Sequence, residues 1–318
     1  MKRIPESSRI FYEQEVAPMI RERFQAYEHR IAAGIAGEGS DCLGYFDHIS
    51  RDHDFGTGVC LWLTEEDYDR IGSVLSIAYH ELAERHPGES ALTDRLRERR
   101  GVMTTRTFYS NILGIDCDTA SGGLTEEQWF TLDHTCLATA VNGAVFRDDL
   151  GEFTRFREML LRYYPDSVWK VRLMEELHFY ASSIQINYAR CMSRGDLVAA
   201  ETCRLRGLES AMQLFFLLKR VYPPYYKWTY RALAELDETG RFACLIRELA
   251  GTGSDLSAWE GKQYHPDVLN LEDRVVVLAE EIAEEILAGL RRLGLTRGMD
   301  PYLERYCDEI RRSFRGQR

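Results

Sequence analysis

The sequence predicts an α+β protein in two parts: a small mixed sheet with flanking helices over residues 1–150, then an all-helical bundle over residues 151–318. In the first part, short apolar segments typical of strands alternate with glycine-rich turns and helices. After the turn Asp149-Leu150-Gly151, every periodic segment has apolar residues at helical spacing. A chain of 318 residues is long enough for one large domain or two ordinary ones, and this change of pattern favours two.

The first part is expected to begin with an amphipathic helix over Ser7–Tyr27 and a buried strand over Arg30–Ala36. A second strand is expected over Asp52–Leu63, followed by a helix over Glu65–Arg85 with Thr64 as its N-cap. His86-Pro87-Gly88 ends this helix. The remaining expected elements are a strand in Gly101–Phe108, a loop over Gly114–Thr125, a helix end at Leu137–Val141 and a short strand over Ala144–Phe146.

The second part contains only segments with helical periodicity. They are Glu152–Leu161, Ser167–Cys191, Asp196–Val221, Lys227–Leu236, Arg241–Leu249, Asn270–Leu293 and Asp300–Ser313, with a polar connection over Gly251–Asp267. The long amphipathic helix Asn270–Leu293 is compatible with a homodimer, or with packing on its own domain.

Composition narrows the classes of partner. The net charge of −11 argues against general binding to nucleic acid or to anionic membranes, since both carry negative charge. No apolar run approaches the roughly 20 residues of a membrane span. The eight cysteines form no C-x-x-C pair, and the N-terminus lacks the apolar core of a signal peptide. We therefore expect a cytoplasmic protein with reduced cysteines.

The stretch Gly39–Gly56 carries the strongest chemical signal. Gly39-Ser40 follows a small apolar strand and can offer backbone N–H groups and a hydroxyl to phosphates. In a strand, Asp52 and Asp54 would point to one face and His53 to the other. Two carboxylates so spaced can hold Mg²⁺. The alternative is a solvated pair at a strand end.

Three segments resemble a known family. They are Gly39-Ser40-Asp41-Cys42-Leu43-Gly44 with Ile49-Ser50-Arg51-Asp52-His53-Asp54-Phe55-Gly56, then Leu137–Phe146 with Asp148, and Tyr222-Pro223-Pro224-Tyr225-Tyr226-Lys227-Trp228. A Gly-Ser turn followed by Asp-x-Asp is the pattern of the polymerase-beta-type nucleotidyltransferase superfamily. The wider run is similar to an uncharacterised branch of it, domain-of-unknown-function family 4037, over about residues 10–240.

This resemblance implies residue roles. Asp52 and Asp54 would bind Mg²⁺ or Mn²⁺, and Gly39 and Ser40 would contact the β- and γ-phosphates of a nucleoside triphosphate. Active members often have a third acidic residue on a later strand, but Gly101–Arg106 contains no carboxylate. Asp116, Asp118 and Asp148 are the candidates, and Asp148 is preferred because it closes a short strand.

Several other residues have two readings. Lys227 could reach a triphosphate, or it could lie over an aromatic packing corner. Asn187 and Arg190 could line a cleft, but decoration of a helix is favoured. Glu175 and Glu176 are candidate general bases, although a charged helix face is the commoner explanation. The basic run Arg95–Arg100 is expected to be a solvated helix surface, and His53-Asp54 lacks the distant ligands of a metal-dependent phosphohydrolase.

The sequence therefore predicts a Mg²⁺-dependent nucleotidyltransferase, with a cleft between its two parts. It would transfer a nucleoside monophosphate, preferably AMP from ATP, to a small-molecule or protein acceptor and release pyrophosphate. Aminoglycoside nucleotidyltransferases, which have helices that complete the acceptor pocket, are a fold-level analogy only. The alternative is a weakly active or inactive nucleotide-binding protein that acts as a sensor or interaction module.

Overall fold

The computed structural model describes residues 5–45, 49, 57–85, 99–121 and 123–315. The chain divides into two compact units, a sheet unit (residues 1–163) and a helical unit (residues 164–318). The helix Glu152–Leu161, which the sequence assigned to the second part, lies in the sheet unit. Its aromatic residues explain this position, as described below.

The sheet unit contains one four-stranded mixed sheet with the strand order β3-β2-β1-β4. The strands are β1 (Ala32–Ile35), β2 (Cys60–Leu63), β3 (Gly101–Thr104) and β4 (Ala144–Arg147). β1 is antiparallel to both of its neighbours, whereas β2 and β3 are parallel. The predicted small mixed sheet with flanking helices is therefore confirmed.

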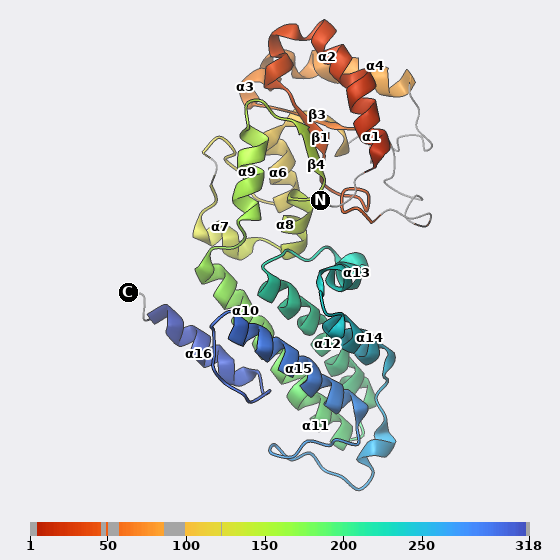
Figure 1. Ribbon diagram of the computed structural model, residues 1–318, viewed down its shortest axis with the longest axis vertical. Coiled ribbons are helices and arrows are strands. Elements are labelled where there is room, and N and C mark those ends of the chain that lie inside the picture. The colour runs from red at the N-terminus through yellow and green to blue at the C-terminus, as the bar shows by residue number, and fades with distance from the viewer. Residues whose placement is uncertain (1–4, 46–48, 50–56, 86–98, 122, 316–318) are drawn as a thin grey trace. The chain divides into compact units, whose positions relative to one another are not determined.

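Helices cover both faces of this sheet (Figure 1). On one side lie α1 (Glu6–Phe11), a π-helical turn (Tyr12–Val16), α2 (Ala17–Arg23) and α4 (Ser73–Arg85). On the other side lie α6 (Thr105–Leu113), α8 (His134–Ala140) and α9 (Glu152–Leu161). The shorter elements of the unit are a 3-10 turn (Gln25–Arg30), α3 (Glu65–Asp67), a π-helical turn (Tyr68–Gly72) and α7 (Glu126–Thr131).

Alternation along β2 explains the two cores. Leu61 and Leu63 join the apolar cluster beneath α1, α2 and α4. Trp62 points to the opposite face, where its ring stacks on Phe153 of α9 at a centroid distance of 3.7 Å. Phe108 of α6 meets the same indole edge-on at 5.4 Å. These contacts bind α9 to the sheet unit.

Local capping explains where the predicted strands and helices begin and end. Thr64 accepts a hydrogen bond from the backbone N–H of Asp67, which confirms it as an N-cap. The prediction of a strand through Phe108 was too long. Thr104 accepts a hydrogen bond from the N–H of Thr107 and starts α6 directly after β3. The predicted second strand is shorter in the described chain, since residues 57–59 are not in β2 and residues 52–56 are outside the described residues.

The helical unit consists, in its described residues, of helices and one isolated β-bridge between His265 and Val268. Its main helices are α10 (Asp166–Tyr180), a π-helical segment (Ala181–Asn187), α11 (Tyr188–Ser193), α12 (Leu197–Lys219), α13 (Tyr226–Leu236), α14 (Arg241–Gly251), α15 (Arg274–Arg292) and α16 (Glu304–Arg315), with a 3-10 turn at Leu256–Trp259. The apolar face of α15, including Leu278, Ile282 and Ile286, is buried within this unit. None of the helices in the described ranges is long and apolar enough to cross a membrane.

Candidate functional site

The turn that follows β1 is held in a conformation that requires glycine. Gly37, Gly39 and Gly44 have φ angles of 103°, 117° and 77°. This left-handed region is costly for residues with a Cβ atom. Within the turn, the N–H of Tyr45 donates to the carbonyl oxygen of Ser40 over 2.8 Å. The predicted Gly39-Ser40 turn therefore exists, with a compact backbone.

The loop between α8 and β4 fixes both ends of this turn. Asn142 makes two hydrogen bonds to Gly37, accepting from its N–H at 2.8 Å and donating to its carbonyl oxygen at 2.7 Å. The N–H of Gly143 donates to the carbonyl oxygen of Cys42 at 2.9 Å. A Cβ atom on Gly143 would lie 1.9 Å from the carbonyl oxygen of Ile35, so only glycine allows this approach.

A buried ion pair supports the turn from inside. Arg100 lies directly before β3, and its Nη2 donates to the Asp41 carboxylate at 3.0 Å. Both side chains are only 1% exposed. Arg100 also donates to the carbonyl oxygen of Ala36 at 3.1 Å and to the Cys42 sulfur at 3.2 Å. One guanidinium therefore ties the end of β1, the turn and β3 together.

The charges in this cluster follow from burial. Burial raises the pKa of the Cys42 thiol, although the neighbouring Arg100 opposes that effect, so Cys42 is a neutral thiol near neutral pH. Burial also works against the charged form of Arg100, but the facing acidic groups, Cys42 first and then Asp41, outweigh it and raise the pKa of Arg100. The Asp41 carboxyl group is the hydrogen-bond partner of Arg100 in this cluster. The Nε of Arg100 is buried and has no hydrogen-bond partner among the described residues.

The strand register shows which of the predicted site residues lie at the same end of the strands. Gly39 and Ser40 follow the C-terminal end of β1. β2 begins at that same end of the sheet, because the strands are antiparallel and Cys60 pairs with Gly34. Residues Asp52 and Asp54, and His53 between them, lie outside the described residues. The described chain resumes at residue 57, three residues before β2 begins.

Asp148 lies at the other end of the sheet. It follows Arg147, which pairs with Ala33 near the start of β1, and the strands there are antiparallel. Its two carboxylate oxygens accept hydrogen bonds from the N–H groups of Gly151 and Thr154 at 2.9 and 2.8 Å. Asp148 therefore does not lie at the end of the sheet that carries Gly39 and Ser40. Its hydrogen bonds give this carboxylate a local role at the start of α9.

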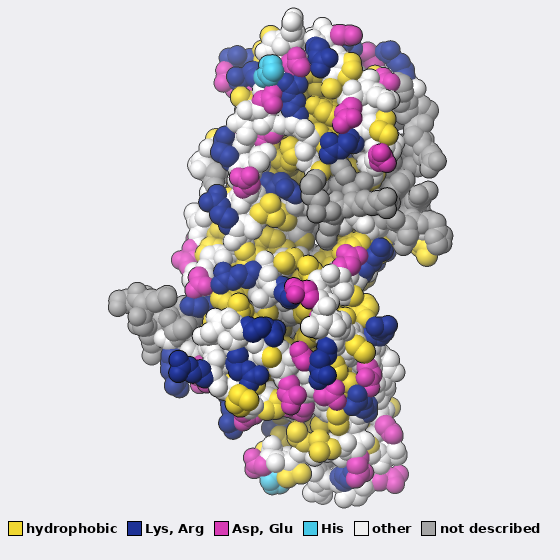
Figure 2. All heavy atoms as spheres, in the orientation of Figure 1, with side chains coloured by type: hydrophobic (Ala, Val, Ile, Leu, Met, Phe, Trp, Pro, Cys, Tyr) yellow, Lys and Arg dark blue, Asp and Glu magenta, His cyan; other side chains and the backbone are white. Residues whose placement is uncertain are grey.

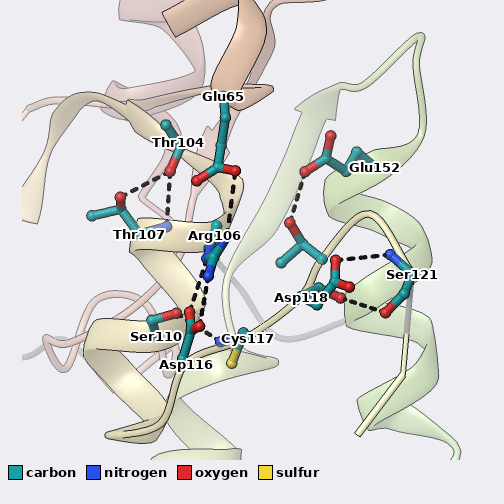
Figure 3. A network of polar contacts seen from close by, with 11 residues as sticks. Glu65, Thr104, Arg106, Thr107, Ser110, Asp116, Cys117, Asp118, Ser121 and Glu152 are labelled. Atoms are coloured by element: carbon teal, nitrogen blue, oxygen red, sulfur yellow. Dashed lines mark hydrogen bonds and ion pairs between the residues drawn. The ribbon is translucent and has the colours of Figure 1, made fainter. Parts of the chain in front are cut away.

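Asp116 and Asp118 lie in a separate polar network beside the start of α6 (Figure 3). Arg106 binds both oxygens of Asp116, at 2.8 and 2.6 Å, and contacts Glu65 at 3.4 Å. This hydrogen bonding lowers the pKa of Asp116. Asp118 accepts from the N–H of Ser121 at 3.1 Å. Across the described ranges, no group of three or more His, Cys, Asp or Glu side chains could hold a metal ion.

Lys227 lies in the helical unit, in the exposed first turn of α13. Its Nζ is 5.3 Å from the centre of the Trp228 ring. The Trp228 indole N–H donates to the Tyr225 hydroxyl at 2.9 Å. This is the geometry of an aromatic packing corner, whereas the neighbouring Tyr226 is 91% exposed. A role for Lys227 in nucleotide binding stays a prediction.

The other helical candidates have local partners. Arg190 donates to Asn187 at 3.4 Å and stacks over Tyr264 at 5.1 Å. Glu176 is partly buried on α10, and burial raises the pKa of its carboxyl to about 7, with Ser210 opposing and Glu209 contributing. A carboxyl that titrates near neutral pH has the proton affinity that general acid–base chemistry requires.

Sequence reasoning missed the residues that hold the turn. Arg100 was assigned to a solvated basic run, and Asp41 and Asn142 received no role. The available signal was position, since Arg100 directly precedes a strand and Asn142-Gly143 directly precedes another. Figure 2 shows basic and acidic side chains interspersed over the visible face of the molecule.

Comparison with known families gives one similarity. Residues 129–229, about a third of the chain, match the family described as "Domain of unknown function (DUF4037)". The expected resemblance to this family is confirmed over that range, which includes the segments 137–146 and 222–228. The Gly39–Gly56 stretch lies outside it. Comparison of the chain with curated proteins and with solved structures gave no match.

Proposed function

We propose that the protein is a nucleotidyltransferase that uses Mg²⁺ or Mn²⁺. It would transfer a nucleoside monophosphate, preferably AMP from ATP, to a small-molecule or protein acceptor. An acceptor oxygen or nitrogen attacks the α-phosphorus, the bond to the bridging oxygen breaks, and pyrophosphate leaves. The observation that carries the proposal is the glycine turn held by Arg100 and Asn142, at the end of the sheet where β2 begins, joined in sequence to Asp52-His53-Asp54.

The turn supports phosphate binding through its backbone. Arg100 and Asn142 hold the turn through the backbone of Ala36 and Gly37 and the side chains of Asp41 and Cys42, so these bonds do not use the backbone N–H groups of Gly39 and Asp41. A preorganised backbone costs little entropy when a phosphate chain binds. In this proposal Gly39 and Ser40 contact the β- and γ-phosphates, and orient the α-phosphorus for in-line attack.

The carboxylates of Asp52 and Asp54 fit a hard divalent cation by donor chemistry, because both are oxygen donors at alternate positions. When bound, such a cation stabilises negative charge on the attacking and leaving oxygens. The small mixed sheet with a glycine turn after its first antiparallel strand supports a nucleotidyltransferase-like fold for residues 1–163.

The test uses the purified full chain with each labelled nucleoside triphosphate, Mg²⁺ or Mn²⁺, and a cell metabolite extract. Pyrophosphate release is expected, and Asp52→Asn with Asp54→Asn should abolish it. Asp69→Asn is the matched control, because this exposed carboxylate in the π-helical turn before α4 belongs to no site proposed here. Release that survives the double substitution would contradict the proposal.

One observation favours a second function, a nucleotide-binding sensor or interaction module on the same fold. β3 (Gly101–Thr104) carries no carboxylate, and Asp148 lies at the end of the sheet opposite to Gly39 and Ser40. Equilibrium binding of a non-hydrolysable triphosphate distinguishes the two functions. Binding that depends on Ser40, with no pyrophosphate release under any condition, would support the module and exclude the transferase.

A further inference from the structure

An open cavity of about 350 Å³ lies at the surface of the helical unit, far in sequence from the glycine turn. Its walls come from the end of α12, the turn between α13 and α14, the start of α14 and the end of α15. Pockets for small molecules commonly begin at roughly this volume. All of the lining residues named for this cavity belong to the helical unit.

One part of the cavity lining is apolar. Phe215 and Phe242 are each 6% exposed, and their ring centres lie 5.1 Å apart. Leu218 and Gly289 complete this part of the lining. A Cβ atom on Gly289 would lie 2.7 Å from a methyl carbon of Leu218. Any larger residue at this position would therefore displace the Leu218 side chain. An aromatic ring or a short alkyl chain suits such a surface.

Most of the charged groups at the cavity already have partners. Asp237 accepts a hydrogen bond from the N–H of Ala243 at 2.9 Å and so caps α14. Glu285 binds Arg241 at 2.6 Å. Lys219 is 3.5 Å from Glu238, in a pair whose side chains are 38% and 88% exposed. A pair this exposed contributes little and rearranges at low cost.

Arg292 is the exception. It is an exposed residue in the last turn of α15 that lines the cavity, and it has no hydrogen-bond or ion-pair partner among the side chains that the structure describes. A guanidinium in this state offers a planar pair of donors to a carboxylate or phosphate. Lys219 lies on the same cavity, with its Nζ 5.9 Å from the Phe215 ring centre.

We propose that this cavity binds a small organic anion with an aromatic or alkyl body, whose anionic group pairs with Arg292 and whose body packs on Phe215 and Phe242. The site lies in the helical unit and is independent of the proposed nucleotidyl transfer. Such a ligand would be an effector of the helical unit.

The test compares three probes of one shape: 3-phenylpropionate, its neutral amide and 3-phenylpropylamine. Binding to the full chain is measured by saturation-transfer NMR and by chemical-shift changes. The acid is expected to bind in the millimolar range and about tenfold more tightly than the amide, which corresponds to about 1.4 kcal/mol. The amine is expected to bind most weakly.

Three variants decide the assignment. Arg292→Gln should reduce binding of the acid to the level of the amide. Leu293→Glu places a negative charge at the cavity and should reverse the preference toward the amine. Arg247→Gln, an exposed arginine on α14 outside the cavity lining, is the control and should change nothing. Equal binding of acid and amide, undiminished binding of the acid by Arg292→Gln, or no detectable binding of any probe would overturn the proposal.

Discussion

The Arg100–Asp41 pair gives the most direct prediction about how the glycine turn is held. Replacing Arg100 with Met keeps an unbranched side chain but removes the guanidinium bonded to Asp41, Ala36 and Cys42. Asp41, whose side chain is 1% exposed, then becomes an unbalanced buried anion. Breaking a buried pair in this way costs about 3–5 kcal/mol of unfolding free energy.

Unfolding in urea is monitored by amide hydrogen exchange in peptides from residues 1–163, so that the sheet unit is measured by itself. Arg70→Met is the matched control, since Arg70 forms an exposed ion pair with Glu66 and its loss should cost less than about 1 kcal/mol. Adding Asp41→Asn to Arg100→Met removes the stranded charge and should restore at least half of the lost stability. A cost for Arg100→Met no larger than for Arg70→Met would show that the buried pair does not stabilise the turn.

Two further predictions concern backbone fit and pH. Gly143→Ala should cost more than about 3 kcal/mol of unfolding free energy, because the added Cβ meets a carbonyl oxygen. Gly114→Ala is the control: Gly114 has the same φ of 68°, its added Cβ meets nothing within 4 Å, and the substitution should cost only about 1 kcal/mol. Equal costs of the two substitutions in urea unfolding would contradict the clash. For Glu176, the folded-state pKa of about 7 is above the unfolded value, so this residue stabilises the fold at low pH and that contribution is lost as pH rises through about 4.5 to 7. Glu176→Gln should therefore be more stable than the native chain at pH 8, by on the order of 1–3 kcal/mol after allowance for its partial exposure, and the difference should disappear near pH 4; a pH-independent difference in thermal unfolding would exclude this titration.

The sequence predicted the sheet, its flanking helices and nearly every helix of the second half, because these depend on local periodicity and capping. Thr64 and Asp196 are caps whose side chains bond to N–H groups three residues on. Short-range chemistry of this kind is readable in one dimension. The position of α9 was not, since it depends on Phe153 meeting Trp62, which is 91 residues away in the chain.

The candidate site divides in the same way. The Gly39-Ser40 turn could be predicted, because glycine before serine after an apolar strand is a local signal. Its supports could not, since Arg100 reaches Asp41 across 59 residues and Asn142 reaches Gly37 across 105. Asp148 is the third acid that the sequence favours, because it follows a short strand. The direction of that strand determines at which end of the sheet the residue lies, and because β4 is antiparallel to β1, Asp148 lies at the end opposite to Ser40.

The central claim is transfer of a nucleoside monophosphate, and the fate of the label tests it most directly. The full chain is incubated with Mg²⁺ and a metabolite extract, using ATP labelled at the α-phosphate in one reaction and at the γ-phosphate in another. A new product is expected to carry the α label, and the γ label is expected only in pyrophosphate. A product that carries the γ label, or label transfer that persists with Asp52→Asn and Asp54→Asn together, would contradict the central claim.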